Sequence, residues 1–272
     1  MTAESARRAE NFELEDIIRL WSICFGDSPE LVRQLYAACS LLETTFVAGS
    51  PPDAMMTAFD GLSLSGRRAS YIYALCTRPE KRGRGLAGAV LSRIIDESFA
   101  RGTQLVCLHP ASLSLWRWYR DAKGFKPLIL AQPREIEPLP AADGTVREIS
   151  AEEFIILSGE FPDLNYPLPL LRAQDLFWRD GSGAFLALES GGVRALALAK
   201  ARGDALLLKQ LCAPPNAERA LATLAARHFG LPRVSLLAPV TPSRDALPDL
   251  CYVTNDPDFI PDHNFVFPFL LD

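Results

Sequence analysis

One short segment, residues 78–87, decides how this sequence is interpreted. It reads Arg78-Pro79-Glu80-Lys81-Arg82-Gly83-Arg84-Gly85-Leu86-Ala87. An apolar run typical of a strand, Ala69 to Thr77, precedes it, and the apolar spacing from Leu86 to Arg101 predicts an amphipathic helix after it. Gly83 and Gly85 permit a tight turn and allow a ligand to approach the main chain closely.

The charges of this segment favour an anionic ligand. Lys81, Arg82 and Arg84 lie just before the predicted helix. The N–H groups of a first helical turn have no partner within the helix, and the helix dipole is positive at that end. We therefore predict a phosphate or pyrophosphate site. The alternative is a solvated basic turn with a glycine bend.

Two common phosphate-binding motifs do not fit the segment. A Walker loop requires Gly-x-x-x-x-Gly-Lys followed by Ser or Thr, and the sequence contains no such string. The dinucleotide fingerprint requires Gly-x-Gly-x-x-Gly, whereas the chain has Gly83-x-Gly85-x-Ala87-Gly88. A nucleotide-binding protein that uses this loop is therefore disfavoured.

The segment resembles the signature of the GNAT acetyltransferase superfamily, Arg/Gln-x-x-Gly-x-Gly/Ala. Residues 82–87 match that signature, and the strand before it and the helix after it are in the family's order. Further on, Leu105 to Leu108, Tyr119 and the pair Gly124-Phe125 resemble the family's later strand and helix, so the likeness extends over about residues 12–130. The opening around Leu20 to Ser28 resembles bacterial members built from two units.

This resemblance implies an α/β (α+β) fold of tandem GNAT-like mixed sheets flanked by helices. It also implies acetyl-CoA as a cosubstrate, with no metal. The strand before the loop would splay from its neighbour and bind the pantetheine arm through the main chain of Leu75, Cys76 and Thr77. The pyrophosphate would be held by the loop amides. The loop residues concerned are Arg82, Gly83, Arg84, Gly85, Leu86 and Ala87.

Acetyl transfer needs an acid that protonates the thiolate leaving group. The family often uses a tyrosine on its penultimate helix, and Tyr119 is the matching residue. Four residues, 120–123, separate Tyr119 from Gly124, where the family usually has three. The alternative is a buried structural tyrosine. The general base is not identified: His109 could face the cleft or be structural, and Ser112 could bind the cofactor or, in the favoured interpretation, cap a helix.

The second half of the chain repeats the pattern of the first without its glycine loop. Leu75-Cys76-Thr77-Arg78-Pro79 corresponds to Leu211-Cys212-Ala213-Pro214-Pro215. Two prolines remove amide donors where a phosphate would need them. We expect a GNAT domain with the acetyl-CoA site at residues 1–132, a linker at 133–145, and a degenerate GNAT-like domain without a CoA loop at 146–272. The second domain could wall the substrate cleft or mediate dimerisation.

Composition restricts the partners and the compartment. The formal net charge is −5 and the isoelectric point is about 5.4, so the overall charge does not favour nucleic acid or an anionic membrane. No apolar run approaches the roughly 20 residues of a membrane span. The first ten residues are charged and do not resemble a signal peptide. The six cysteines have no metal-ligand spacing and are expected to be reduced thiols in the cytoplasm.

These features together predict an acetyl-CoA-dependent N-acetyltransferase that moves an acetyl group directly to an amine. The acceptor is a small molecule or a peptide that the sequence does not identify, and a homodimer is left open. The main alternative is a non-catalytic acyl-CoA-binding regulatory protein, which would be favoured if Tyr119 pointed away from the cleft.

Overall fold

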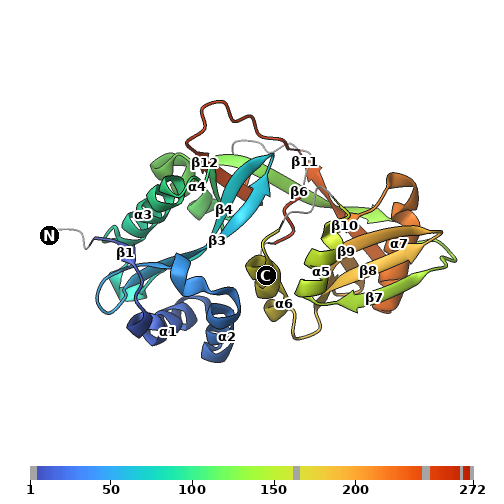
Figure 1. Cartoon of the computed structure of the whole chain (residues 1–272), viewed down its shortest axis with the longest axis horizontal. Coiled ribbons are helices and arrows are strands. Elements are labelled where there is room, and N and C mark those ends of the chain that lie inside the picture. The colour runs from blue at the N-terminus through green and yellow to red at the C-terminus, as the bar shows by residue number, and fades with distance from the viewer. Residues whose placement is uncertain (1–4, 162–165, 241–245, 264–265, 270–272) are drawn as a thin grey trace. The chain divides into compact units, whose positions relative to one another are not determined.

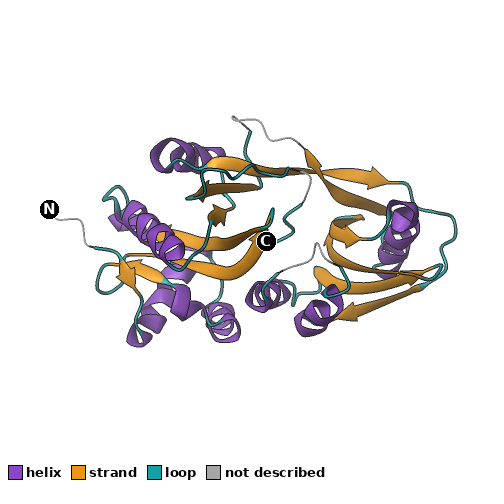
Figure 2. Ribbon diagram, turned by 45° about the horizontal axis from the view of Figure 1, so that its top comes forward, coloured by secondary structure: helices purple, strands orange, loops and turns teal. Residues whose placement is uncertain are grey.

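The computed structural model describes residues 5–161, 166–240, 246–263 and 266–269, and its chain forms two compact units. The first unit comprises Met1–His109 and Tyr252–Ile260, and the second comprises Pro110–Cys251 and Pro261–Asp272. Figures 1 and 2 show that each unit contains strands covered by helices. The mixed α/β fold class expected from the sequence is confirmed.

The first unit contains most of the residues that match the GNAT signature and its surroundings. Its elements are β1 (Arg7–Arg8), η1 (Asn11–Glu13), α1 (Leu14–Phe25), α2 (Pro29–Cys39), η2 (Leu41–Thr44), β2 (Phe46–Ala48), β3 (Ala54–Leu64), β4 (Arg67–Thr77), η3 (Pro79–Lys81), α3 (Leu86–Ala100) and β5 (Leu105–Leu108). The strands lie in the order β1-β2-β3-β4-β5. Neighbours are antiparallel except β4 and β5, which are parallel. Helices α1 and α2 lie on one side of this sheet and α3 on the other (Figure 1).

Local sequence signals determine where α1 and α2 end and begin. Gly26 closes α1 in the left-handed conformation, with φ of 82°. Ser28 precedes α2 and its hydroxyl accepts a hydrogen bond from the amide of Leu31, while Pro29 occupies the first helical position. The apolar stripe of α1 is buried against the sheet, with Ile17 and Leu20 fully shielded from solvent.

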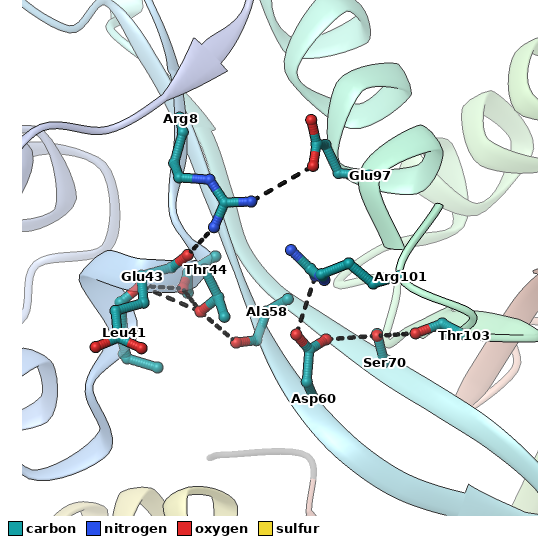
Figure 3. Close-up of polar contacts among 11 residues, drawn as sticks. Arg8, Leu41, Glu43, Thr44, Ala58, Asp60, Ser70, Glu97, Arg101 and Thr103 are labelled. Carbon is teal, nitrogen blue, oxygen red and sulfur yellow. Dashed lines mark hydrogen bonds and ion pairs between the residues drawn. The ribbon is translucent and has the colours of Figure 1, made fainter. Parts of the chain in front are cut away.

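Polar contacts fix α3 to the strands beneath it, as Figure 3 shows. Asp60 of β3 accepts hydrogen bonds from Ser70 of β4 at 2.5 Å and from Arg101, which follows α3, at 2.9 Å. Glu97 of α3 forms an ion pair with Arg8 of β1 at 3.4 Å. These contacts hold the C-terminal end of α3, so the direction of its N-terminal end is also set.

The last strand of the chain contributes its final residues to the first unit. β12 (Leu250–Thr254) follows β5 in the strand order. The Thr254 hydroxyl donates to the carbonyl of Gln104 at 2.8 Å, and Asp256 pairs with Arg67 of β4 at 2.6 Å. The sequence analysis did not predict this strand. The place of this strand depends on contacts between residues about 150 positions apart, such as Thr254 and Gln104. Local sequence patterns do not predict contacts of that kind.

The second unit repeats the mixed arrangement. Its elements are α4 (Leu113–Lys123), β6 (Lys126–Ile136), β7 (Thr145–Ile149), α5 (Ala151–Ser158), α6 (Leu168–Phe177), β8 (Gly183–Ser190), β9 (Val193–Arg202), β10 (Ala205–Cys212), α7 (Pro215–His228) and β11 (Arg233–Val240). The strand order is β6-β11-β10-β9-β8-β7, and only β10 and β11 are parallel among these pairs.

Successive side chains along the strands of the second unit point to opposite faces of its sheet, and apolar side chains are buried on both faces. Leu186 and Leu188 of β8 belong to the core cluster that contains Leu221 of α7. Phe185, the residue before Leu186, points to the opposite face, and its ring lies 5.2 Å from that of Phe154 in α5. Helix α7 therefore covers one face and α5 the other.

The expected linker at 133–145 is not a linker throughout its length. Pro133 and Ile136 belong to β6 and pair with Leu237 and Val234 of β11. Most side chains of residues 131–135 are exposed. The sequence there therefore lacks the alternation of apolar and polar residues that predicts a strand. The compact units also divide at His109/Pro110 instead of at residue 132, which places α4 and β6 in the second unit.

The cap of α2 can be tested by substitution. Ser28→Ala removes the acceptor of the Leu31 amide, 3.2 Å away, and should lower the free energy of unfolding by about 1 kcal/mol. Ser28→Asp keeps an acceptor at this position and should retain most of that stability. Chemical denaturation of the three proteins measures the difference. Equal stability of Ser28→Ala and the wild type would contradict the role of the cap.

Candidate functional site

The end of β4 is displaced from regular pairing by an extra residue. Thr57 pairs with Tyr73, and Met55 pairs with Cys76, so β4 has one residue more than β3 across this interval. Ala74 within it has φ of 57°, which non-glycine residues rarely adopt. This geometry is a β-bulge, and bulges bend a strand and redirect its main-chain groups.

The registered pairs between β4 and β5 stop well before β4 ends. They run from Ala69↔Leu105 to Tyr71↔Cys107, and among the described residues no later pair joins the two strands. Leu75, Cys76 and Thr77 lie beyond the last pair. Leu75 and Thr77 are partly exposed and Cys76 is buried. These residues therefore lie where the splayed strand end was expected.

The loop after β4 makes its turns with glycine. Gly83 and Gly85 have φ of 76° and 81°, a region that L side chains rarely occupy. A Cβ added at either position would meet no other atom within 4 Å. The glycines are thus required by the conformation of the main chain, and the space beside them is open. Both residues are exposed.

The basic side chains of the loop have different partners. Asp53 forms ion pairs with Arg78 and Lys81, each at 3.1 Å. The Arg82 Nε donates to the carbonyl of Thr77 at 3.3 Å, while Arg84 is exposed. Lys81 was expected to add positive charge at the helix mouth, but Asp53 compensates that charge. The sequence did not predict a role for Asp53, because this residue lies 25 positions before Arg78 and sequence spacing does not connect the two.

The start of α3 offers the main-chain donors that the sequence analysis predicted. Gly85 is the N-cap residue and supplies no side-chain cap. Leu86 and Ala87 occupy the first turn, whose N–H groups have no acceptor inside the helix. An anion placed over Gly85 would receive these donors together with the positive end of the helix dipole. The space beside Gly83 and Gly85 is open, since a Cβ built at either glycine meets nothing within 4 Å.

Tyr119 belongs to α4 of the second unit, whereas the loop belongs to the first. Its side chain is 5% exposed, and its ring lies 5.5 Å from that of Phe125 and 4.9 Å from that of Trp118. Burial raises the pKa of the Tyr119 phenol above its usual value, so the hydroxyl remains protonated at physiological pH.

The other two candidates from the sequence occupy different positions. The Ser112 hydroxyl accepts a hydrogen bond from the amide of Leu115 at 3.2 Å and caps α4, as the favoured interpretation held. His109 follows β5 directly and is partly buried. A catalytic function of His109 stays a prediction.

The corresponding loop of the second unit has a different chemistry. Pro214 is the N-cap residue of α7 and Pro215 is its first residue. Proline has no N–H, so this helix start lacks a main-chain donor that α3 has. The amide of Ala217 donates to the carbonyl of Pro214 at 2.9 Å.

Two other kinds of feature are absent from the described parts of the chain. No group of three or more histidine, cysteine, aspartate or glutamate side chains is arranged to hold a metal ion there. Likewise, none of the helices in these parts has both the length and the apolar character needed to cross a bilayer.

Comparison with known families identifies the first part of the chain. Residues 5–121 match the family model described as acetyltransferase (GNAT) domain. The match includes the bulged strand, the glycine loop, α3 and most of α4. A search of curated proteins found no match.

Solved structures resemble the chain over most of its length. A probable N-acyltransferase from Enterococcus faecalis V583 has a TM-score of 0.67 at 15% identity, with 92% of this chain and 72% of that chain covered. A GCN5-related N-acetyltransferase from Anabaena variabilis ATCC 29413 has a TM-score of 0.68 at 16% identity, covering 93% and 70%. One from Kribbella flavida has a TM-score of 0.61 at 19% identity, covering 88% of this chain but only 64% of the Kribbella chain.

Residues 5–121 are thus a GNAT acetyltransferase domain by the family model, and the solved structures show a similar fold over most of the chain. The resemblance noted in the sequence is confirmed for this part of the chain. The domain match supports acyl-CoA-dependent acetyl transfer as the general class of reaction.

Proposed function

We propose that this protein transfers the acetyl group of acetyl-CoA directly to an amine, and that the glycine loop before α3 binds the CoA pyrophosphate. The observation that carries the proposal is the combination of Gly83 and Gly85 at positive φ, open space beside both, and the first turn of α3 behind them. Main-chain donors at a helix start bind phosphate oxygens without the help of a particular side chain.

The displaced end of β4 would hold the pantetheine arm. The early end of its pairing with β5 supports this, because the β5 edge of Leu75, Cys76 and Thr77 has no registered partner among the described residues, while Cys76 and Thr77 still pair with β3. The pyrophosphate would then lie against residues 82–87. Arg84 is exposed and would add an attraction for phosphate, and within the described residues it forms no ion pair with a carboxylate.

In a direct transfer, the nitrogen lone pair of the amine forms a bond to the acetyl carbon. The carbon–sulfur bond of the thioester then breaks, and the thiolate of CoA leaves. We assign to Tyr119 the donation of a proton to that thiolate, because it matches the family's usual proton donor and its phenol is protonated at physiological pH. Solvent then returns a proton to the Tyr119 phenolate. The proton lost by the amine passes to solvent.

The second unit would be a GNAT-like copy that has lost CoA binding. Its β10, α7 and β11 form a parallel crossover like that of β4, α3 and β5. β10 also has a register shift, between Leu208 and Gln210, where β4 has its bulge. The likeness of these units supports a tandem arrangement, with Pro214 and Pro215 in place of the phosphate loop.

A second candidate is a regulatory protein that binds acyl-CoA without turning it over. The burial of Tyr119, which is only 5% exposed, favours it, because an acid must reach its substrate. Release of CoA in the presence of a panel of amines separates the two functions. For the catalytic protein, we place the acceptor among small molecules and peptides, and the protein in the cytoplasm, where its six free cysteines would persist.

The phosphate loop can be tested by ligand-induced stabilisation. Acetyl-CoA at 100 times its dissociation constant should stabilise the wild type by about 2.7 kcal/mol. Gly85→Asp should remove this effect, because a carboxylate at the helix start repels phosphate and a side chain is strained at this φ. Thermal denaturation with and without acetyl-CoA makes the measurement.

The matched control for that experiment is Gly191→Asp. Gly191 also has positive φ, 56°, and open space, but it lies in the turn between β8 and β9. This variant should keep the full stabilisation by acetyl-CoA. A folded Gly85→Asp protein that is stabilised as strongly as the wild type would refute the loop assignment.

The number of CoA sites tests the assignment of the second unit. Calorimetric titration of the whole chain should give one CoA per chain, because the start of α7 has prolines in place of the donors. Two equivalent sites would show that the second unit also binds CoA.

The proton donor can be tested with Tyr119→Phe. The ring keeps its packing against Phe125, so the fold and the affinity for acetyl-CoA should be unchanged. Turnover with an amine found in the panel should fall by about 10²-fold or more, the usual scale for a lost acid. Tyr252→Phe removes a different buried hydroxyl and should keep full turnover. Full turnover by Tyr119→Phe would transfer the role to water or to another residue.

A further inference from the structure

Two cysteines from distant parts of the first unit meet at the end of β4. Cys24, in the last turn of α1, has its Sγ 3.6 Å from the carbonyl oxygen of Thr77. Cys76 directly precedes Thr77 in β4, and its thiol is near enough to interact with that of Cys24. Cys24 is partly exposed, whereas Cys76 is 7% exposed. The pair therefore consists of one thiol that solvent can reach and one directly behind it.

The charges around the pair make the two thiols unequal. The interaction with the Cys76 thiol and the positive charges of Arg82 and Arg78 outweigh burial and lower the pKa of Cys24 to about 7. The same interaction, together with burial, raises the pKa of Cys76 well above its usual value. At neutral pH a substantial fraction of Cys24, about half at pH 7, is thus a thiolate, and Cys76 remains a thiol. Thiolate character and access to solvent are what make a cysteine reactive.

We propose that Cys24 and Cys76 form a redox-sensitive pair, in which a peroxide oxidises Cys24 and Cys76 then closes a disulfide between α1 and β4. This inference stands on the geometry of the two thiols and is independent of the proposed acetyl transfer.

The chemistry proceeds in two balanced steps. In the first, the Cys24 thiolate attacks one peroxide oxygen, the O–O bond breaks, and the leaving hydroxide or alkoxide takes a proton from solvent. Cys24 is then a sulfenic acid. In the second, the sulfur of Cys76 attacks that of Cys24, the S–O bond breaks, and hydroxide leaves as water with the proton of Cys76. The two sulfurs lose two electrons in total, and the peroxide accepts them.

The position of the pair gives the disulfide a structural consequence. Thr77 directly follows Cys76, and its carbonyl accepts hydrogen bonds from both Cys24 and Arg82. Oxidised Cys24 has no S–H to donate, so the hydrogen bond that its protonated thiol makes to the Thr77 carbonyl is lost. The disulfide also fixes the last turn of α1 to the strand end from which the glycine loop starts.

Intact-mass spectrometry of the whole chain after treatment with hydrogen peroxide tests the proposal. The wild type should lose roughly 2 Da, the mass of two hydrogen atoms, and dithiothreitol should restore the original mass. Peptide mapping should find Cys24 joined to Cys76. Cys76→Ser should instead stop at the sulfenic acid, gain roughly 16 Da, and react with dimedone.

Two further variants complete the design. Cys24→Ser should not lose mass at the same peroxide dose, because the buried Cys76 thiol remains protonated. Cys39→Ser removes a buried cysteine of α2 outside the pair and should behave as the wild type does. In the unmodified protein, the alkylation rate of Cys24 by iodoacetamide should rise with pH and reach half its maximum near the pKa of about 7.

Two results would overturn the proposal. One is a wild-type protein whose Cys24 and Cys76 are both still alkylated, after unfolding, at a peroxide dose that oxidises other cysteines. The other is a mass loss that persists in Cys76→Ser, because Cys24 would then pair with a different partner. The iodoacetamide profile of the wild type needs no substitution, so it decides the reactivity of Cys24 even if a variant fails to fold.

Discussion

The parallel pairing of β4 with β5 is the constraint on which the candidate site depends. Parallel strands cannot be joined by a tight turn, so the chain must leave β4, cross over the sheet in α3 and return. The crossover brings the first turn of a helix next to the end of a strand. Gly83 and Gly85 adopt positive φ and so make the entry to α3 compact while leaving the space beside it open. The ion pairs of Asp53 with Arg78 and Lys81 fix the beginning of the same loop.

The second unit has the same crossover with a different helix start. β10, α7 and β11 have the same parallel connection, and α7 is buried against its sheet. At the start of α7, however, the N-cap residue is Pro214 where α3 has Gly85, and the first helical residue, Pro215, has no N–H. The two units thus share an architecture and differ in the few main-chain donors that an anion requires.

Much of the fold could be predicted from local signals in the sequence. The caps at Ser28 and Ser112 and the glycine after α1 determine helix ends through interactions within a few residues, so the sequence contains them. The glycine loop was predicted for the same reason. The conformation of the loop is as expected, whereas its binding of CoA and the role of Tyr119 remain proposals.

Features that depend on distant residues were not predicted. β6 continues through Pro133 to Ile136 because β11 pairs with it, although its exposed side chains have no alternation. The partner of Lys81 is Asp53, and the partner of Cys76 is Cys24, both in other elements. No spacing rule connects such positions. The site therefore could be located from the sequence, but its charge balance and its reactive thiol required the structure.

The most direct test of the account is an amide chemical-shift titration of ¹⁵N-labelled protein with CoA. If main-chain donors at the start of α3 bind the pyrophosphate, the amides of Gly83, Gly85, Leu86 and Ala87 should shift most and saturate together. The amides at the start of α7, such as that of Asn216, should not move with them. Saturable shifts that leave residues 83–87 unchanged would contradict the account, because CoA would then bind elsewhere on the chain.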